Sequence, residues 1–196
     1  MKNFKKALEF QKLLQKFNAI YRDMGSIHDP EIPDNDVEHS YRVAMLCWMI
    51  IEEYKLKYDL GKVLKYALLH DLVEVYAGDK SIYLDYSQKE KEKEEHKSLL
   101  KLKKNYPNLK SFWKIIAEYE KRKDEEAKFV YLIEKLEPIF TVLVSEKDHF
   151  IKRKISFDNF FDRKQRKIKD LKLSAQIFNK ETMEYLIKNK KKYFRL

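Results

Sequence analysis

The sequence has little of the residues that interrupt helices or cross-link a chain. Its 196 residues include three glycines, four prolines and one cysteine. So few breakers favour long helices over a pattern of short, turn-separated strands. The single cysteine excludes an internal disulfide framework, and Cys47 stands in the apolar run "VAMLCWMII", where we interpret it as a small core residue rather than a nucleophile. A reducing, cytoplasmic setting fits this cysteine usage.

Long hydrophobic runs are also missing. The first residues, "MKNFKKALEF", hold no apolar stretch of signal-peptide length, and no window reaches the roughly 18 apolar residues of a membrane span. We therefore expect neither a signal peptide nor a membrane span. A chain of this length is most simply one domain over residues 1–196, long enough to bury roughly 70% of its unfolded surface.

Basic residues outnumber acidic residues, but the two kinds are interspersed along the chain. The chain has 42 Lys and Arg against 32 Asp and Glu, a formal net charge of +10. A basic surface attracts polyanions, but here lysines alternate with glutamates, as in "QKEKEKEEHK", which is typical of solvated helix faces. The one purely basic run is "KNKKK" at 188–192. With no recognised nucleic-acid motif beside it, we do not expect a nucleic-acid function.

Helical periodicity runs through the whole sequence and predicts an all-α fold. Asp59 and Asp124 stand where helices can begin, Ser87 and Glu90 have the spacing of a capping box, and Pro138 marks a point at which a helix can bend. The expected helices cover about residues 3–21, 36–55, 60–76, 87–104, 109–121 and a long segment after 124, followed by two more helices or helical fragments.

The stretch "YALLHDLVEVYAGD", residues 66–79, places ionisable residues in a helix that otherwise looks buried. Burying such groups costs several kcal/mol unless they are paired. On a helix, His70 and Asp71 both flank Glu74, so the three line one wall of a cleft. A divalent cation would offset the cost of burial, because imidazole nitrogen and carboxylate oxygen are its usual ligands. His39, near the start of the 36–55 helix, offers a second nitrogen to the same ion.

Three blocks of sequence then resemble a known family. They are "NDVEHSYRVAMLCWMI", "KYALLHDLVEVYAGD" and "EYEKRKDEEAKFVYLIEKLEP", and they look like the signature blocks of the HD-domain metal-dependent phosphohydrolases, in the branch that includes bacterial 5'-deoxynucleotidases. The blocks lie within about residues 20–140, whereas the C-terminal helices, about 148–196, match only loosely. The resemblance implies an HD-domain helical bundle.

The resemblance also implies a metal site. It assigns one divalent ion, Mn, Co or Mg, to His39, His70, Asp71 and a residue at position 134. Where relatives usually read "ALDKLEP", this chain reads "LIEKLEP", so that Glu134 replaces an aspartate. The extra methylene moves the carboxylate by about 1.5 Å. Glutamate still ligates hard ions, but a misplacement of about 1 Å can lower a catalytic rate about a hundredfold. We favour retained metal binding, with a weakened or silent site as the alternative.

Further roles follow from the same resemblance. It makes Glu74 the group that assists proton transfer, Asp79 the group that positions the nucleophile or the sugar, and Arg22 a phosphate clamp. A guanidinium suits that task because it binds two oxygens at once. Glu38 and Lys135 also match the family pattern. An arginine near a helix end is equally often a surface charge, so this reading of Arg22 competes with a structural one.

The expected activity is removal of the 5'-phosphate from deoxyribonucleoside monophosphates by a metal-activated water. Two alternatives stay open: hydrolysis of another small phosphate ester, and a non-catalytic domain that binds a nucleotide or a partner. Kinship suggests a homodimer, for which the apolar excess of "FWKIIAEY" at 112–119 could serve, unless it belongs to the core. We expect Trp48 and Trp113 in the core, and the remaining histidines on the surface: His28, His96 and His149.

Overall fold

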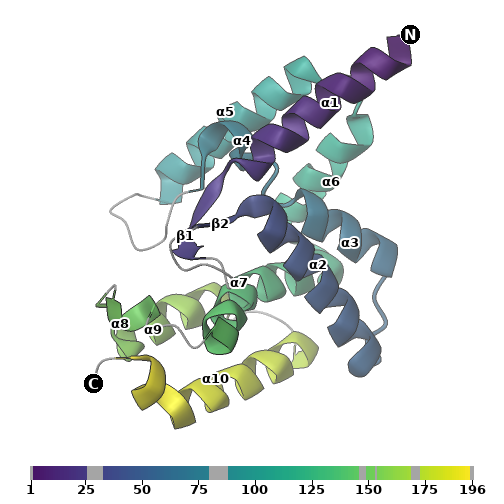
Figure 1. The fold of residues 1–196 in the computed structure, drawn as a ribbon. Coiled ribbons are helices and arrows are strands. Elements are labelled where there is room, and N and C mark those ends of the chain that lie inside the picture. Colours follow the sequence, from purple (N-terminus) through teal and green to yellow (C-terminus); the bar gives the residue numbers. More distant parts are fainter. Residues whose placement is uncertain are drawn as a thin grey trace.

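The computed structural model describes residues 2–25, 33–79, 88–145, 149–152, 154–168 and 173–194. Within these ranges the chain is mainly helical, which confirms the all-α expectation (Figure 1). The helices are α1 (Lys2–Asn18), α2 (Asp36–Glu53), α3 (Leu60–Leu69), α4 (Glu74–Ala77), α5 (Gln88–Asn105), α6 (Lys110–Lys121), α7 (Glu125–Ser145), α8 (His149–Lys152), α9 (Phe157–Ile168) and α10 (Leu173–Tyr193).

Helix α7 is the element around which the others are arranged. It contacts α2, α3, α6 and α10, and it crosses the middle of the molecule in Figure 1. Helices α1, α5 and α6 gather at one end of the molecule, and α8, α9 and α10 gather at the other. Because α2 and α3 also pack on each other, the three helices α2, α3 and α7 form the central group that carries the histidines.

Two of the expected helix starts are confirmed by capping bonds. The side chain of Asp59 accepts a hydrogen bond from the backbone N–H of Lys62 at 3.1 Å, and Asp124 accepts one from Ala127 at 2.9 Å. Each bond satisfies one of the N–H groups that the first turn of a helix leaves unpaired. The proposed capping residue Ser87 lies outside the described residues.

Two expectations about local structure are wrong. The segment 60–76 is not one helix, because α3 ends at Leu69 and α4 begins at Glu74. Between them the backbone makes tighter bonds, from the N–H of Leu72 to the carbonyl of Leu69 at 3.2 Å and from Glu74 to Asp71 at 2.8 Å. We also expected no strands, yet β1 (Tyr21–Gly25) pairs antiparallel with β2 (Pro33–Asn35).

The buried apolar side chains form two clusters. One lies among α2, α3, α7 and the C-terminal helices and includes Cys47, which confirms that the cysteine is a core residue. The other joins α1, α4, α5 and α6 and includes Trp113. Trp48 was also expected in the core, but 43% of its surface is exposed, because it lies on the outer face of α2. His96 is exposed, as expected.

None of the helices in the described ranges combines the length and the apolar character that crossing a bilayer requires.

The central position of α7 predicts that truncating its buried side chains lowers the free energy of unfolding. Leu136 is fully buried in the first cluster, so Leu136→Ala should lower the free energy of unfolding by about 2–5 kcal/mol through lost burial and a cavity. Val144, on the same helix but 70% exposed, is the matched control, and Val144→Ala should change stability by less than about 0.5 kcal/mol. Urea denaturation followed by circular dichroism measures both, and equal effects would contradict the central role of α7.

Candidate functional site

His39 lies in the first turn of α2, where the chain fixes its position closely. The side chain of Asn35 caps this helix by accepting hydrogen bonds from the N–H groups of Val37 and Glu38, both at 3.0 Å. His39 is buried, and its Nδ1 lies 2.6 Å from Oε2 of Glu137 on α7. Its Nε2 therefore faces the other way, 3.8 Å from Oδ2 of Asp71.

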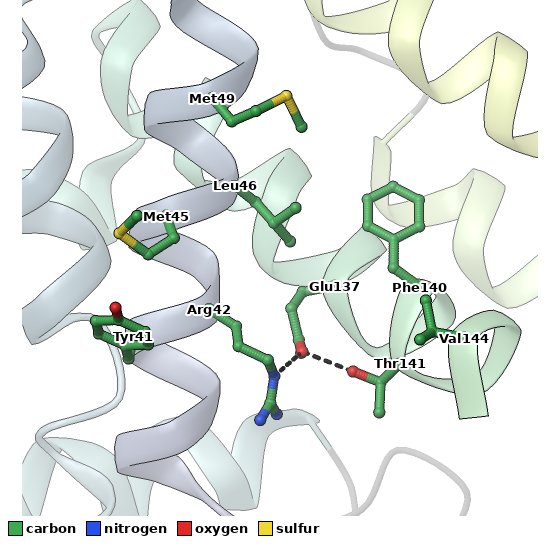
Figure 2. A pocket seen from close by; sticks show the side chains of 9 residues that line it. All are labelled: Tyr41, Arg42, Met45, Leu46, Met49, Glu137, Phe140, Thr141 and Val144. Atoms are coloured by element: carbon green, nitrogen blue, oxygen red, sulfur yellow. Dashed lines mark hydrogen bonds and ion pairs between the residues drawn. The ribbon is translucent and has the colours of Figure 1, made fainter. Parts of the chain in front are cut away.

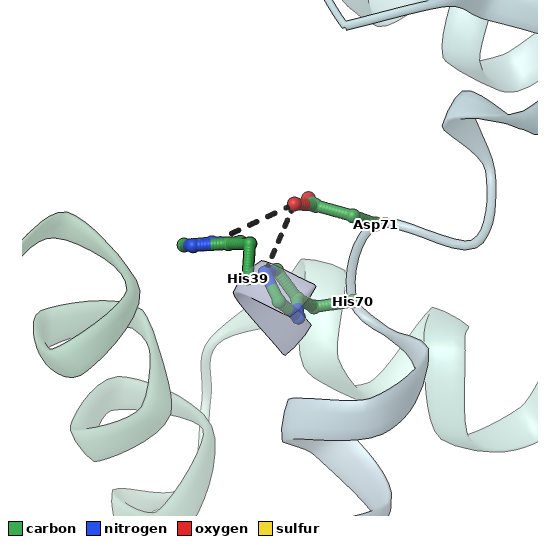
Figure 3. A group of neighbouring side chains, drawn as sticks. All are labelled: His39, His70 and Asp71. Atoms are coloured by element: carbon green, nitrogen blue, oxygen red, sulfur yellow. Dashed lines mark ion pairs between the residues drawn. The ribbon is translucent and has the colours of Figure 1, made fainter. Parts of the chain in front are cut away.

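His70 and Asp71 occupy the tight turn between α3 and α4. Nδ1 of His70 lies 2.8 Å from the carbonyl oxygen of Ala67, and since a carbonyl can only accept, Nδ1 carries a proton and donates it. This leaves Nε2 of His70 directed at Oδ2 of Asp71, 3.1 Å away. Figure 3 shows one side of the Asp71 carboxylate facing both imidazole rings, which contact each other edge to face.

The three side chains fit a divalent cation. Ligand atoms of His39, His70 and Asp71 all lie within 4.8 Å of one another. Ligands held at about 2.1 Å from one ion stand roughly 3–3.5 Å apart. The 3.1 Å between His70 and Asp71 falls in this range, and the 3.8 Å between His39 and Asp71 is slightly longer. Nε2 of His70 is buried and has no hydrogen-bond partner in the described structure, although two carboxylates lie close to it. Nitrogen and carboxylate oxygen are also the donor set that such ions prefer.

Glu134, the fourth residue of the expected metal set, reaches only one side of this group. Its Oε2 lies 3.3 Å from Nε2 of His70, while its Oε1 lies 2.5 Å from Nζ of Lys135. Glu134 is not among the residues whose ligand atoms are all within 4.8 Å of one another. Burial raises the pKa of Glu134, but the charges of Lys135 and His70 outweigh burial and hold it below its usual value. The side chain is thus an ionised carboxylate at the edge of the cluster.

Arg22 enters the site from β1 and bridges two buried carboxylates. Its Nη1 donates to Oδ1 of Asp36 at 3.0 Å and to Oδ2 of Asp71 at 3.1 Å. Burial lowers the pKa of Arg22, yet Asp71, Asp79 and Asp36 together raise it. Burial and the charge of Asp71 raise the pKa of Asp36 to about 7. The structure therefore places Arg22 beside the group of His39, His70 and Asp71, but on a strand rather than at the end of a helix.

Glu74 begins α4 and is buried, with a carboxylate oxygen within 4.8 Å of carboxylate oxygens of both Asp36 and Asp71. Its Oε1 accepts a hydrogen bond from Nζ of Lys91 on α5 at 3.0 Å, and its Oε2 has no hydrogen-bond partner within the described residues. Burial, followed by the negative charge of Asp71, raises the pKa of Glu74 well above its usual value. This shift favours the protonated form of Glu74 more than in an ordinary glutamate, against the opposing charge of Lys91.

Asp79 follows Gly78, whose φ of 74° is a left-handed conformation that glycine adopts readily. Asp79 is partly buried, and its charge raises the pKa of both Arg22 and Glu74, so it faces the same site. Glu38, by contrast, is exposed at the start of α2. The structure thus brings together the expected catalytic and metal residues and leaves Glu38 outside.

Several contacts at the site have no counterpart in the sequence analysis. Asp36 precedes His39 by three residues, and Glu137 follows Glu134 by three, so helical spacing alone puts each on the same face as a proposed ligand. That spacing could have identified both. Lys91 stands in a lysine and glutamate run with nothing to distinguish it from its neighbours.

Comparison with known proteins identifies the family and the fold. Residues 15–176 match the sequence model of the HD domain. The chain is 30% identical to the 5'-deoxynucleotidase HDDC2 of Dictyostelium discoideum over 79% of this chain and 86% of that protein. It is 31% identical to the Xenopus laevis protein of the same name, over 72% and 70%. A predicted metal-dependent phosphohydrolase from Magnetospirillum magnetotacticum has the same fold, with a TM-score of 0.78, 21% identity and coverage of 98% and 96%. The chain belongs to the HD domain family.

Proposed function

We propose that this chain is a metal-dependent phosphohydrolase that removes the 5'-phosphate from deoxyribonucleoside monophosphates. One observation carries the proposal: two buried histidines direct their Nε2 atoms at a single carboxylate oxygen of Asp71, in an arrangement that fits a divalent ion. The relatives named 5'-deoxynucleotidase support the choice of substrate.

His39, His70 and Asp71 would hold the ion, with Glu134 at the edge of the site as a fourth ligand. Manganese, cobalt and magnesium all accept this mixture of nitrogen and oxygen donors. When bound, such an ion makes water nucleophilic at neutral pH and offsets the negative charge of a phosphoryl group. Asp71 contacts both histidines and Arg22, so it is the residue on which the site depends most.

The surrounding residues have roles that follow from their charges. Glu74 is suited to hold a proton and give it to the leaving oxygen, because its Oε2 is buried and its pKa is raised. Arg22 can bind phosphate oxygens by exchanging its contact with Asp36 for one with the substrate. Asp79, on the same side, would orient the sugar or the attacking water.

One observation favours a second candidate. Glu134 lies outside the group of mutually close ligand atoms and is tied to Lys135. If it holds no ion, the domain is a weak or silent enzyme that binds a nucleotide or a partner. A third reading keeps the chemistry and changes the ester, since the ligand set does not determine the leaving group.

We further propose that residues 1–196 form one domain that works in the cytoplasm. Both apolar clusters contribute residues next to the metal site, Tyr66 and Ala67 from one and Leu72 and Val73 from the other, which supports a single unit. The buried thiol of Cys47 suits a reducing compartment.

The proposed homodimer needs a surface other than residues 112–119. Trp113, Ile116 and Tyr119 of that segment are buried in the chain's own core. The outer face of α2 supports the proposal better, because five large apolar side chains are exposed on it at helical spacing: Val37, Tyr41, Met45, Trp48 and Met49.

Phosphate release tests the proposed activity. Chelator-treated protein should release phosphate from deoxyribonucleoside monophosphates only after Mn²⁺, Co²⁺ or Mg²⁺ is added. Asp71→Ala should lower kcat/KM by at least about a thousandfold, because it removes the carboxylate that both histidines face. Asp158→Ala, which changes an exposed aspartate on α9, is the control and should leave the rate unchanged. Ribonucleotides and simple phosphate esters complete the panel.

The same assay separates the alternatives. A silent natural protein that gains activity in Glu134→Asp would identify the catalytically weakened domain. Faster release from another ester would change the substrate class. Metal-independent release, or full activity in Asp71→Ala, would contradict the proposed site.

Arg22 should also stabilise the site before substrate binds. In metal-free protein, Arg22→Met leaves Asp36 and Asp71 without their shared cation, so the free energy of unfolding should fall by roughly 3 kcal/mol. Adding Asp36→Asn should recover part of this loss. Lys97→Met, which removes a cation from an exposed ion pair with Glu94, should cost less than about 1 kcal/mol. Denaturation in the presence of chelator measures all three, and an unaffected Arg22→Met protein would show that the bridge has no stabilising role.

The dimer is tested by light scattering after size-exclusion chromatography. The natural chain should elute with twice its formula mass of 23.9 kDa. Met45→Glu places a charge in the exposed apolar row of α2 and should shift the population to monomer. Leu100→Glu makes the same change at an exposed position on α5 and should leave the dimer intact. A monomeric natural chain, or a dimer insensitive to Met45→Glu, would refute this assignment of the surface.

A further inference from the structure

Glu137 is a buried carboxylate with three contacts on two elements of the chain. Its Oε2 lies 2.6 Å from Nδ1 of His39, and its Oε1 accepts hydrogen bonds from Nε of Arg42 at 2.5 Å and from Oγ1 of Thr141 at 2.8 Å. Figure 2 shows the Arg42 and Thr141 side chains meeting at this oxygen. Arg42 also pairs with Asp34, which holds the guanidinium in place from its other side. Both oxygens of Glu137 are therefore engaged.

These contacts determine which nitrogen of His39 carries the proton. Arginine is always a donor, so the carboxylate beside it is an acceptor at both oxygens. Nδ1 of His39 must then donate, and the lone pair of the neutral ring is left on Nε2. That atom is the one that faces Asp71. The orientation of His39 is thus determined by Glu137 on α7, and not by the residues that would surround the cation.

We infer that Glu137 is a positioning residue for the metal centre, which acts through His39 and is itself held by Arg42 and Thr141. The inference rests on the proposed metal site. Carboxylates that hold a metal-binding histidine typically account for a 10–100-fold difference in metal affinity. Glu137 touches neither the proposed cation nor the substrate, so its effect should appear in metal binding before it appears in any rate.

The two residues that hold Oε1 of Glu137 also line a groove at the protein surface. Arg42 and Thr141 line a groove of about 410 Å³ between α2 and α7, whose other walls are mainly apolar (Figure 2). Thr141 has no contact with His39 among the hydrogen bonds and ion pairs of the described residues, yet it holds the oxygen opposite the one that the histidine uses. Removing its hydroxyl should therefore weaken metal binding in the same direction as loss of Glu137, by a smaller factor.

The test measures metal affinity rather than activity. Full-length protein is stripped with chelator, and Mn²⁺ binding is measured by calorimetry and by competition with a chromophoric chelator. Glu137→Gln keeps the size of the side chain but replaces one acceptor oxygen by a donor NH₂, so either His39 or Arg42 loses its partner. We expect the Kd for Mn²⁺ to rise 10–100-fold in Glu137→Gln, and to rise measurably but by less than about tenfold in Thr141→Val. Glu125→Gln, in the first turn of the same helix, should leave Kd unchanged.

Thr141→Val keeps the inference testable if Glu137→Gln does not fold, which circular dichroism of the metal-free proteins would reveal. The Co²⁺ absorption spectrum adds a direct readout, since a reoriented His39 should change its bands. An unchanged Kd in a folded Glu137→Gln, with or without lower stability, would overturn the inference and leave the proposed function standing. If Glu137→Gln does not fold, an unchanged Kd in Thr141→Val overturns it. A natural protein that binds no Mn²⁺ or Co²⁺ would overturn both.

Discussion

The pairing of buried carboxylates with cations is the interaction on which this structure depends. Four acidic groups at the centre each face a positive partner from another part of the chain. Arg22 on β1 forms ion pairs with Asp36 and Asp71. Lys91 on α5 pairs with Glu74, and Arg42 on α2 pairs with Glu137. Each pair joins segments far apart in sequence, so the site also connects the elements that surround it. Because pairs of buried ions rarely stabilise a fold more than apolar packing would, their concentration here points to function.

The ligands stand where the chain passes from one apolar cluster to the other. Ala67 at the end of α3 belongs to the cluster around α7, and Leu72, two residues after the His70–Asp71 pair, belongs to the cluster around α1, α5 and α6. The tight turn between them presents His70 and Asp71 to His39, while their neighbours stay packed on either side. Packing in both directions limits how far the pair can move, and such rigidity is what a preorganised site requires.

Most of the helices could be predicted from the sequence, because the presence of a helix depends on local apolar periodicity. The break at 70–73 could not, since Leu69, Leu72 and Val73 keep the apolar pattern of a helix while packing into a different cluster. The strand position of Arg22 depends on pairing with β2, and the partnership of Lys91 with Glu74 depends on where α5 docks. His39, His70 and Asp71 were identifiable because buried histidines and carboxylates need a partner, whereas the cations that surround them look like ordinary surface charges.

The fold holds the glutamate at position 134, the proposed fourth ligand, from two directions. Pro138 lacks the N–H that would bond the carbonyl of Glu134, so one backbone hydrogen bond of α7 is missing at the residue whose side chain lies at the edge of the site. Lys164 on α9 donates to the carbonyl of the next residue, Lys135, at 2.6 Å, and the Lys135 ammonium holds one oxygen of Glu134. The other oxygen is left directed at His70. Contacts from α7 and α9 therefore hold this carboxylate in place without a cation. The side chain of Glu134 is one methylene longer than that of aspartate, but these contacts already fix the position of its carboxylate.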